Sequence, residues 1–254
     1  MSDSRVKYER IDSAAVLTIN RPERRNAIDG ETAALLEQRF EQFCADDTAL
    51  TLIVAGAGGQ AFCAGADLKA VETLIPRLEG VGGPIGFSRL HSPKPTIAAV
   101  SGWCLAGGFE LALWCDIRIA TAESKFGFTE RRFGVPLVDG GTQRLPRVVG
   151  AGVALDLTLS GRVVDAEEAH RIGLANELVA EGQHLTRALE YAEMLATFPR
   201  RTMLADREAL YTGMDLPLDE GLAFEARSGA ATLEDAAAGA ARFASGEGRS
   251  ANPL

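Results

Sequence analysis

Residues 94–116 read KPTIAAVSGWCLAGGFELALWCD, and this stretch decides the fold. The apolar run at 96–100, which follows a proline, is typical of a buried strand. A helix-like apolar pattern follows at 108–115. The glycines between the two runs indicate a tight turn. Glu110 is the single charge within residues 96–115, and a membrane span would place it deep in lipid at a cost of several kcal/mol. The stretch therefore predicts a strand, a glycine turn and a buried helix.

Short apolar runs continue to alternate with helical patterns on both sides of this stretch. Strands are expected at residues 15–19, 51–55 and 117–120, and an amphipathic helix at 30–44. Strands separated by helices of this length indicate β-α-β units, so the predicted fold class is α/β. After about residue 150 an alanine-rich helical pattern dominates. We expect an α/β core over residues 1–198 and a helical region over residues 199–254.

The composition argues against several classes of partner. The 254 residues carry 26 basic and 35 acidic side chains, a net charge of −9, without a cluster of lysine and arginine. Such a chain is a poor candidate for binding nucleic acid or an anionic membrane. No H-E-x-x-H motif occurs, so we expect no metal. Four cysteines without a C-x-x-C pair and an N-terminus without an apolar secretory run predict a cytoplasmic protein.

A glycine motif at residues 56–61, GAGGQA, fits the dinucleotide-binding pattern in its letters. That pattern should open a helix and be followed about twenty residues later by an acidic side chain that ends the next strand. Here small residues follow the motif, and Glu79 comes after a helical pattern rather than a strand. Nicotinamide binding is therefore disfavoured.

Two glutamates lie in apolar, glycine-containing surroundings. Glu110 falls in the first turn of the predicted buried helix, where the peptide dipoles favour a negative charge. Glu130 ends the mostly apolar run 126–130. Each has a purely structural alternative: Glu110 as a helix N-terminal charge, and Glu130 as an ion-pair partner of Arg131 or Arg132.

Two glycine turns raise the odds of a functional site. Residues 64–67, Ala-Gly-Ala-Asp, and residues 106–108, Ala-Gly-Gly, both offer backbone N–H groups without side-chain obstruction. Two converging N–H groups form an oxyanion hole, and Gly107 is expected at a helix N-terminus that adds to it. For either turn taken alone, tight packing is the favoured explanation.

At this point the chain resembles the crotonase (enoyl-CoA hydratase/isomerase) superfamily over about residues 15–199. The blocks that carry the resemblance occur in one order: residues 20–22 with 26–27, 62–68, 94–102, 106–112, 115–116, 126–130, 140–146 and 173–175. The resemblance implies a spiral of β-β-α units that forms two nearly perpendicular sheets. It also implies that the C-terminal helices build a homotrimer, or a hexamer of two trimers.

The resemblance assigns a role to individual residues. It implies an oxyanion hole made by the N–H groups of Ala66 and Gly107, and acid/base roles for Glu110 and Glu130. The coenzyme A part of the substrate would be bound by a set of residues in two loops: Arg25, Ala64, Ala66, Asp67, Leu68 and Lys69. Residues implied near the acyl chain are Trp103, Leu105 and Phe133. No cofactor beyond the coenzyme A of the substrate is implied.

The chemistry of these groups favours reversible hydration of a 2-trans-enoyl-CoA to a 3-hydroxyacyl-CoA, as in fatty-acid or related acyl-CoA catabolism. Hydration needs one carboxyl group to take a proton from water and another to deliver one to the α-carbon, and both glutamates are present. The enzyme alternatives are a double-bond isomerase, which can manage with one carboxylate, and a hydratase for a branched or cyclic acyl-CoA. The non-enzyme alternative is a coenzyme A- or RNA-binding homologue without catalysis.

Asp139 departs from the pattern of many hydratases and adds a third carboxylate near the expected pocket. Its structural interpretation, which we favour from the sequence, is a cap on the helix that begins near Gly140. The functional alternative is a part in a different proton transfer.

The helical C-terminal region carries apolar residues that a short extension has limited means of burying. They include Met203, Leu204, Leu210, Leu218, Leu222, Phe224 and Phe243. A large exposed apolar patch on a monomer would be a liability, so an assembly is expected. The alternative is that these residues fold back onto their own core.

Overall fold

The computed structural model describes residues 4–246, which form two compact units divided between Ala192 and Glu193. The first unit contains two β-sheets and the helices that cover them. The second contains three helices. The expected boundary at 198/199 falls at the start of the helix α7 (Arg200–Gly213).

The larger sheet of the first unit has six strands in the order β1-β2-β3-β5-β7-β10. Their bounds are β1 Val6–Ile11, β2 Ala14–Ile19, β3 Thr51–Gly56, β5 Thr96–Val100, β7 Ile117–Thr121 and β10 Glu177–Val179. β1 and β2 form an antiparallel hairpin, and every later neighbour pairs in parallel. Parallel pairing requires a crossover after each strand, as the expected β-α-β units do.

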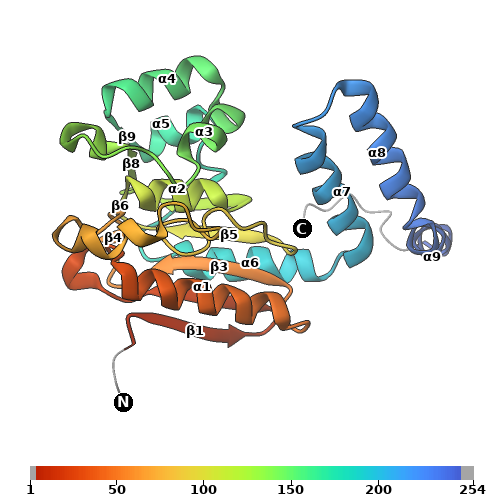
Figure 1. Ribbon diagram of the computed structural model, residues 1–254. Coiled ribbons are helices and arrows are strands. Elements are labelled where there is room, and N and C mark those ends of the chain that lie inside the picture. The colour runs from red at the N-terminus through yellow and green to blue at the C-terminus, as the bar shows by residue number, and fades with distance from the viewer. Residues whose placement is uncertain (1–3, 247–254) are drawn as a thin grey trace. The chain divides into compact units, whose positions relative to one another are not determined.

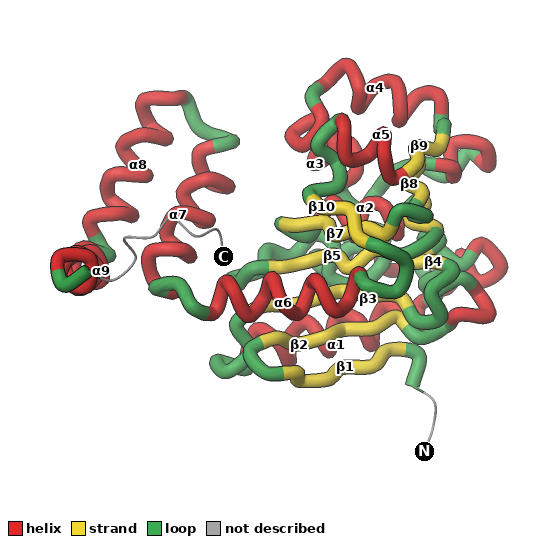
Figure 2. Tube along the Cα trace, turned by 180° about the vertical axis from the view of Figure 1, so that it is seen from behind, coloured by secondary structure: helices red, strands yellow, loops and turns green. Residues whose placement is uncertain are grey.

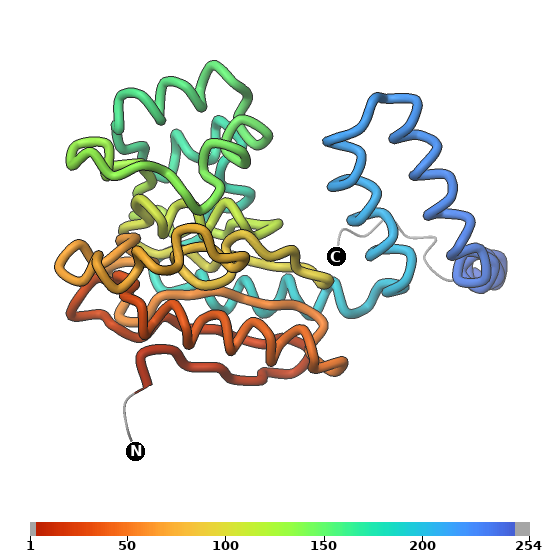
Figure 3. The backbone as a smooth tube through the Cα atoms, in the orientation of Figure 1, coloured from red at the N-terminus to blue at the C-terminus, as the bar shows by residue number. Residues whose placement is uncertain are grey.

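The smaller sheet has four strands in the order β4-β6-β8-β9. Their bounds are β4 Ala61–Cys63, β6 Trp103–Leu105, β8 Lys125–Gly127 and β9 Val163–Asp165. Each of β3, β5 and β7 in the larger sheet is followed directly by β4, β6 or β8 in the smaller one. The chain therefore spirals, and each turn adds one strand to each sheet (Figures 1 and 3).

Helices of the first unit cover both sheets. Their bounds are α1 Gly30–Ala45, α2 Gly107–Trp114, α3 Gly141–Val149, α4 Ala151–Ser160, α5 Ala166–Arg171 and α6 His184–Ala196. Short 3₁₀ helices are η1 Pro22–Arg24, η2 Leu68–Thr73, η3 Ile75–Arg77 and η4 Thr129–Phe133. Helix α6 runs along one face of the larger sheet (Figure 2). Its Ala188 and Ala192 pack in the cluster that contains Ile97.

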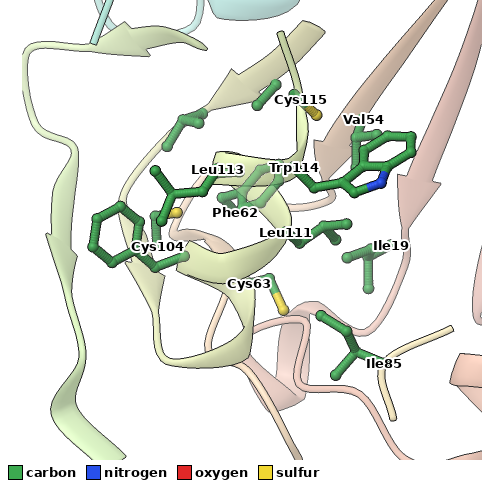
Figure 4. Packing of buried hydrophobic residues seen from close by; sticks show 14 of the residues in the cluster. Ile19, Val54, Phe62, Cys63, Ile85, Cys104, Leu111, Leu113, Trp114 and Cys115 are labelled. Carbon is green, nitrogen blue, oxygen red and sulfur yellow. The ribbon is translucent and has the colours of Figure 1, made fainter. Parts of the chain in front are cut away.

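The main core surrounds α2, the helix that the opening stretch predicts. Every residue of α2 after Gly107 is buried, Glu110 included. Leu111, Leu113 and Trp114 pack with Phe62 and other apolar side chains of both sheets (Figure 4). A helix that is apolar on all sides is stable only inside a core, so its one carboxylate is carried into the interior.

Four long strands confirm the sequence predictions, while the long strand β1 and the short strands were not predicted. Strands were expected at 15–19, 51–55, 96–100 and 117–120, and β2, β3, β5 and β7 occupy these positions. Five three-residue strands, β4, β6, β8, β9 and β10, were not predicted, because three residues are too few to show a period. Residues 68–78, whose sequence predicts a moderately helical stretch broken at Pro76, form the two 3₁₀ helices η2 and η3.

The second unit consists of α7, α8 (Leu218–Ala230) and α9 (Leu233–Ala244), with α7 packed on α8. Several of its large apolar side chains are exposed: Leu210, Met214, Leu218, Leu222, Leu233 and Phe243. Residues 247–254 of the predicted C-terminal region lie outside the described residues. Within residues 4–246, no helix has the length and apolar character that a membrane span requires.

Candidate active site

A cavity of about 190 Å³ opens where η2, the loop before β5, the start of α2 and η4 meet. Its lining is mostly apolar, with three carboxylates. The lining residues are Ala64, Ala66, Leu68, Val71, Leu74, Leu78, Pro84, Ile85, Ala106, Gly107, Glu110, Thr129, Glu130, Phe133, Val135, Pro136, Val138 and Asp139. The cavity therefore combines an apolar wall with a small set of convergent polar groups, as ligand pockets do.

The loop that carries Ala66 is fixed by backbone hydrogen bonds on both sides. The N–H of Ile28 donates to the carbonyl of Gly65 at 2.8 Å, and the N–H of Asp67 donates to the carbonyl of Ile28 at 2.8 Å. The buried Arg21 guanidinium pairs with the Asp67 carboxylate at 3.1 Å. The N–H of Ala66 has no acceptor within residues 4–246, so this fixed loop presents an open donor at the cavity.

The second open donor is the N–H of Gly107, the first residue of α2. The N–H of Ala106 before it donates to the carbonyl of Gly127 at 2.9 Å, which anchors the turn to β8. Ala106 adopts φ 51° and ψ −128°, a backbone conformation that costs a non-glycine residue about 1–3 kcal/mol. No acceptor in the described part of the chain takes the Gly107 N–H, which lies at the positive end of the helix dipole.

The two donors are close neighbours. A Cβ atom added to Gly65 would lie 2.7 Å from the Gly107 nitrogen, and one added to Gly107 would lie 3.8 Å from the Ala66 nitrogen. Two open N–H groups at this spacing, at the edge of a cavity, can bind one oxygen atom that gains negative charge. The structure thus places next to each other the two N–H groups that the family resemblance implies as a pair.

Glu110 is 3% exposed and is held in place by two hydrogen bonds. Its Oε1 accepts from the N–H of Asp139 at 3.0 Å and from the N–H of Gly141 at 2.7 Å. Burial raises the pKa of Glu110 to about 7, the Gly141 hydrogen bond opposes that rise, and the Asp139 charge adds to it. A carboxyl group with a pKa near neutrality suits proton transfer at physiological pH.

Glu130 is 7% exposed and is buried differently. Within residues 4–246 neither of its carboxylate oxygens has a hydrogen-bond partner, and it forms no ion pair with Arg131 or Arg132. The structural interpretation of this residue is therefore wrong. Burial raises the pKa of Glu130 to about 7 as well, while the residue's own backbone N–H and the charge of Arg131 act in the opposite direction.

Aromatic packing connects the two glutamates. The ring of Phe109, next to Glu110, lies 4.6 Å from the ring of Phe128, two residues before Glu130. Ring pairs of this kind contribute about 0.5–1.5 kcal/mol beyond the area that they bury. The start of η4 is thereby anchored to α2, and both carboxyl groups line the same cavity.

Asp139 lines the cavity, but it does not cap the following helix. The N-terminal cap of α3 is Gly140, and no side chain hydrogen-bonds there. The Asp139 Oδ1 instead accepts from the hydroxyl of Ser88 and from the N–H of Ile85. The cap prediction is therefore wrong, because the carboxylate is turned toward the loop before β5.

The other residues expected at the site divide into two groups. Ala64, Leu68 and Phe133 line the cavity, and Phe133 is 70% exposed at its mouth. Arg25 and Lys69 are exposed on the two loops next to it and are not among its lining residues. Asp67 is occupied by Arg21 and by the N–H of Lys69. Trp103 and Leu105 lie on β6, outside the lining.

Sequence reasoning missed most of the apolar wall. Val71, Leu74, Leu78 and Ile85 come from the irregular segment between β4 and β5. A signal existed, since large apolar residues recur at 68, 71, 74 and 78. That spacing indicates one covered face of a helical segment. No group of acidic, histidine or cysteine side chains suited to hold a metal occurs among the described residues.

The spiral of two sheets and the paired donors beside two buried carboxyl groups define an acid–base enzyme of the crotonase fold. The chain belongs to the enoyl-CoA hydratase/isomerase family, whose model matches residues 9–248. It is 37% identical over 232 residues to the short-chain-enoyl-CoA hydratase of Clostridium acetobutylicum, covering 90% of this chain and 89% of the relative.

Two further relatives extend the comparison. The (E)-benzylidenesuccinyl-CoA hydratase of Thauera aromatica is 34% identical over 223 residues, which cover 86% of this chain and 87% of that protein. The crystal structure of enoyl-CoA hydratase EchA1 from Mycobacterium marinum matches with a TM-score of 0.88 at 34% identity, covering 95% of this chain and 96% of that one. The similarity therefore includes both units of the chain.

Proposed function

We propose that this protein is an enoyl-CoA hydratase, which adds water reversibly to a 2-trans-enoyl-CoA and gives the 3-hydroxyacyl-CoA. The observation that carries the proposal is one cavity lined by two open N–H donors and two carboxyl groups whose pKa values are raised to about 7. Relatives named short-chain-enoyl-CoA hydratase and crotonyl-CoA hydratase, at 37% and 35% identity, support it.

The two donors supply the electrostatic part of the reaction. With the thioester oxygen between the N–H groups of Ala66 and Gly107, the β-carbon of the enoyl group becomes electrophilic. The negative charge that develops on this oxygen in the enolate is stabilised most, since the donors are already in place before the reaction. By analogy with acyl-transfer enzymes, each donor contributes about 2.7–4 kcal/mol.

The two glutamates supply the proton transfers. Ionised Glu110 takes a proton from water as the oxygen bonds to the β-carbon, and protonated Glu130 gives its proton to the α-carbon. In total, one water is added to the substrate. Glu110 then releases its proton to solvent and Glu130 takes one up, which restores the starting state of both groups. The backbone hydrogen bonds from Asp139 and Gly141 hold Glu110 in one orientation for this step.

The coenzyme A part of the substrate is expected against residues 64–68, with Arg25 and Lys69 toward its phosphates. Both cations are exposed beside the cavity, which supports contact with a charged, solvated group. The apolar lining next to Glu130 suits an acyl chain. This chemistry needs no cofactor beyond the coenzyme A of the substrate.

We further propose a homotrimer, or a hexamer of two trimers, in the cytoplasm. Exposed apolar side chains of the second unit, among them Leu218, Leu222 and Leu233, support an assembly. The acidic composition fits a small-molecule partner rather than nucleic acid or membrane.

The direct test is a comparison of purified protein on crotonyl-CoA and on a 3-enoyl-CoA of equal length. The proposal predicts a higher kcat/KM for the 2-enoyl thioester, with 3-hydroxyacyl-CoA as the product. A preference for the 3-enoyl thioester would instead make the protein a double-bond isomerase. Turnover of neither, together with salt-sensitive binding of RNA, would overturn an enzymatic function.

A further inference from the structure

The cavity contains a third carboxylate that hydration does not require. Asp139 is 3% exposed, and its Oδ1 accepts hydrogen bonds from the Ser88 hydroxyl and the Ile85 N–H. Both donors belong to the loop before β5, which forms part of the apolar wall through Pro84 and Ile85. The Asp139 side chain therefore ties down the wall against which an acyl chain would pack.

The backbone of the same residue holds the glutamate. The Asp139 N–H donates to the Oε1 of Glu110 at 3.0 Å, and the Gly141 N–H donates to the same atom at 2.7 Å. The guanidinium of Arg144 links the segment that carries Asp139 to the loop before β5. It donates to the carbonyl of Asp139 at 2.9 Å and to that of Ser88 at 2.6 Å. Arg89 adds a second link, with a hydrogen bond of 2.7 Å to the carbonyl of Val138.

We propose that Asp139 is a positioning residue for the hydration proposed above: its carboxylate holds the acyl-pocket wall through Ser88 and Ile85, and its backbone N–H holds Glu110. The consequence for the pH dependence of kcat/KM rests on the proposed function. Two separate consequences follow, one for ligand binding through the Ser88 contact and one for pH dependence through the charge.

The charges around this pair are those of Asp139, Glu110, Glu130, Arg89 and Arg144. The Asp139 and Glu130 carboxylates both disfavour ionisation of Glu110 and raise its pKa, in addition to burial. Burial raises the pKa of Asp139, while the hydrogen bonds from Ser88 and Ile85 and the charges of Arg89 and Arg144 lower it. An ionised Asp139 therefore acts on Glu110 and has no comparable effect on the pKa of Glu130.

Three variants separate charge from contact. Asp139→Asn keeps an oxygen that can accept from Ser88 and Ile85 but removes the charge. Ser88→Ala keeps the charge and removes one contact to the wall. Asp139→Ala removes both. Glu123→Gln, at an exposed position between β7 and β8, is the control for the loss of one negative charge.

The first measurement is the pH profile of kcat/KM for crotonyl-CoA. In Asp139→Asn the acidic limb moves to lower pH, because Glu110 ionises more easily, and the alkaline limb stays in place. In Ser88→Ala the acidic limb moves less, and in Glu123→Gln neither limb moves. An Asp139→Asn profile that overlays that of the wild type overturns the inference.

The second measurement is the dissociation constant of butyryl-CoA, a saturated ligand that cannot be hydrated. Ser88→Ala removes one hydrogen bond that holds the wall and weakens binding by about 3- to 10-fold, the effect of an ordinary hydrogen bond. Asp139→Ala weakens binding more, since it removes both contacts to the wall. Equal affinity in Ser88→Ala and the wild type overturns the inference even if Asp139→Asn does not fold. If the wild type binds butyryl-CoA but hydrates no enoyl-CoA, the proposed function is contradicted. The effect of Ser88→Ala on the dissociation constant can still be measured in that case.

Discussion

The regions around Glu110 and Glu130 reach the same pKa, about 7, by the same cause, burial, but they hold their carboxyl groups in opposite ways. Glu110 lies in the regular helix α2 and accepts two backbone hydrogen bonds. Glu130 lies in the short 3₁₀ helix η4, and its oxygens have no partner within residues 4–246. One carboxyl group is fixed and the other is left open.

This difference fits two roles in one reaction. A hydrogen bond donated to a carboxylate favours its ionised form, so the donors on Glu110 suit a base that must be ionised. Burial is the dominant effect on Glu130 and favours its protonated form, which suits an acid. The open oxygens of Glu130 also remain available to a carbon atom of the substrate, which accepts a proton without a preceding hydrogen bond.

The largest expected effect comes from removing either carboxyl group. We expect Glu110→Gln and Glu130→Gln each to lower kcat for hydration of crotonyl-CoA by roughly 10²–10⁴-fold, the usual contribution of a general acid or base. Steady-state assays with crotonyl- to decenoyl-CoA measure it. Near-normal rates in both variants would contradict the assignment of Glu110 as base and Glu130 as acid, because neither group would then transfer a proton.

The next effect concerns the proposed oxyanion hole formed by the N–H groups of Ala66 and Gly107. Gly65 has φ +86°, and an added Cβ would lie 2.7 Å from the Gly107 nitrogen and 2.8 Å from the Ala106 Cβ. We expect Gly65→Ala to displace one donor and lower kcat by about 10²–10³-fold. Gly59→Ala is the matched control, since Gly59 has φ +72° and open space around its Cβ position. Equal losses in the two variants would assign the effect to backbone strain.

The pH dependence is a smaller effect and sharpens the assignment of roles. The proposed mechanism needs Glu110 ionised and Glu130 protonated, and both pKa values lie at about 7. The profile of kcat/KM should therefore be bell-shaped with its maximum near neutrality, and the two apparent values belong to the pair. Activity that stays constant from about pH 5 to 9 would contradict the raised pKa values.

The smallest expected effect is on stability. The pKa of Glu130 rises from 4.5 to about 7 in the folded chain, so the folded state holds the proton more tightly than the unfolded state does. The free energy of unfolding must then fall as pH rises from the lower value to the higher one. Glu130→Gln should raise Tm by a few degrees above the wild type at about pH 8 and have little effect near pH 4. The exposed Glu123→Gln should change Tm at neither pH, and an equal rise there would point to net charge instead.

The sequence predicted the parts of this site that depend on local pattern. Residues 96–115 form a strand, a turn and a helix that begins at Gly107 and contains Glu110. This could be predicted because the apolar pattern on all sides of the helix indicates burial. Contacts between distant segments were not predictable in the same way. Asp139 and Ser88 are 51 positions apart, and a local capping preference gave the wrong partner for Asp139. The missing partner of Glu130 is also a tertiary property, since two arginines follow it in the chain.

Exchange of the α-hydrogens of butyryl-CoA with D₂O tests the division of roles most directly, because it needs the oxyanion hole and the group at the α-carbon but no attacking water. The account predicts that the wild type and Glu110→Gln both catalyse this exchange, while Glu130→Gln loses it. NMR of the recovered thioester measures the deuterium content. Exchange that survives in Glu130→Gln and disappears in Glu110→Gln would contradict the assignment of the fixed carboxyl group as the base and the open one as the acid.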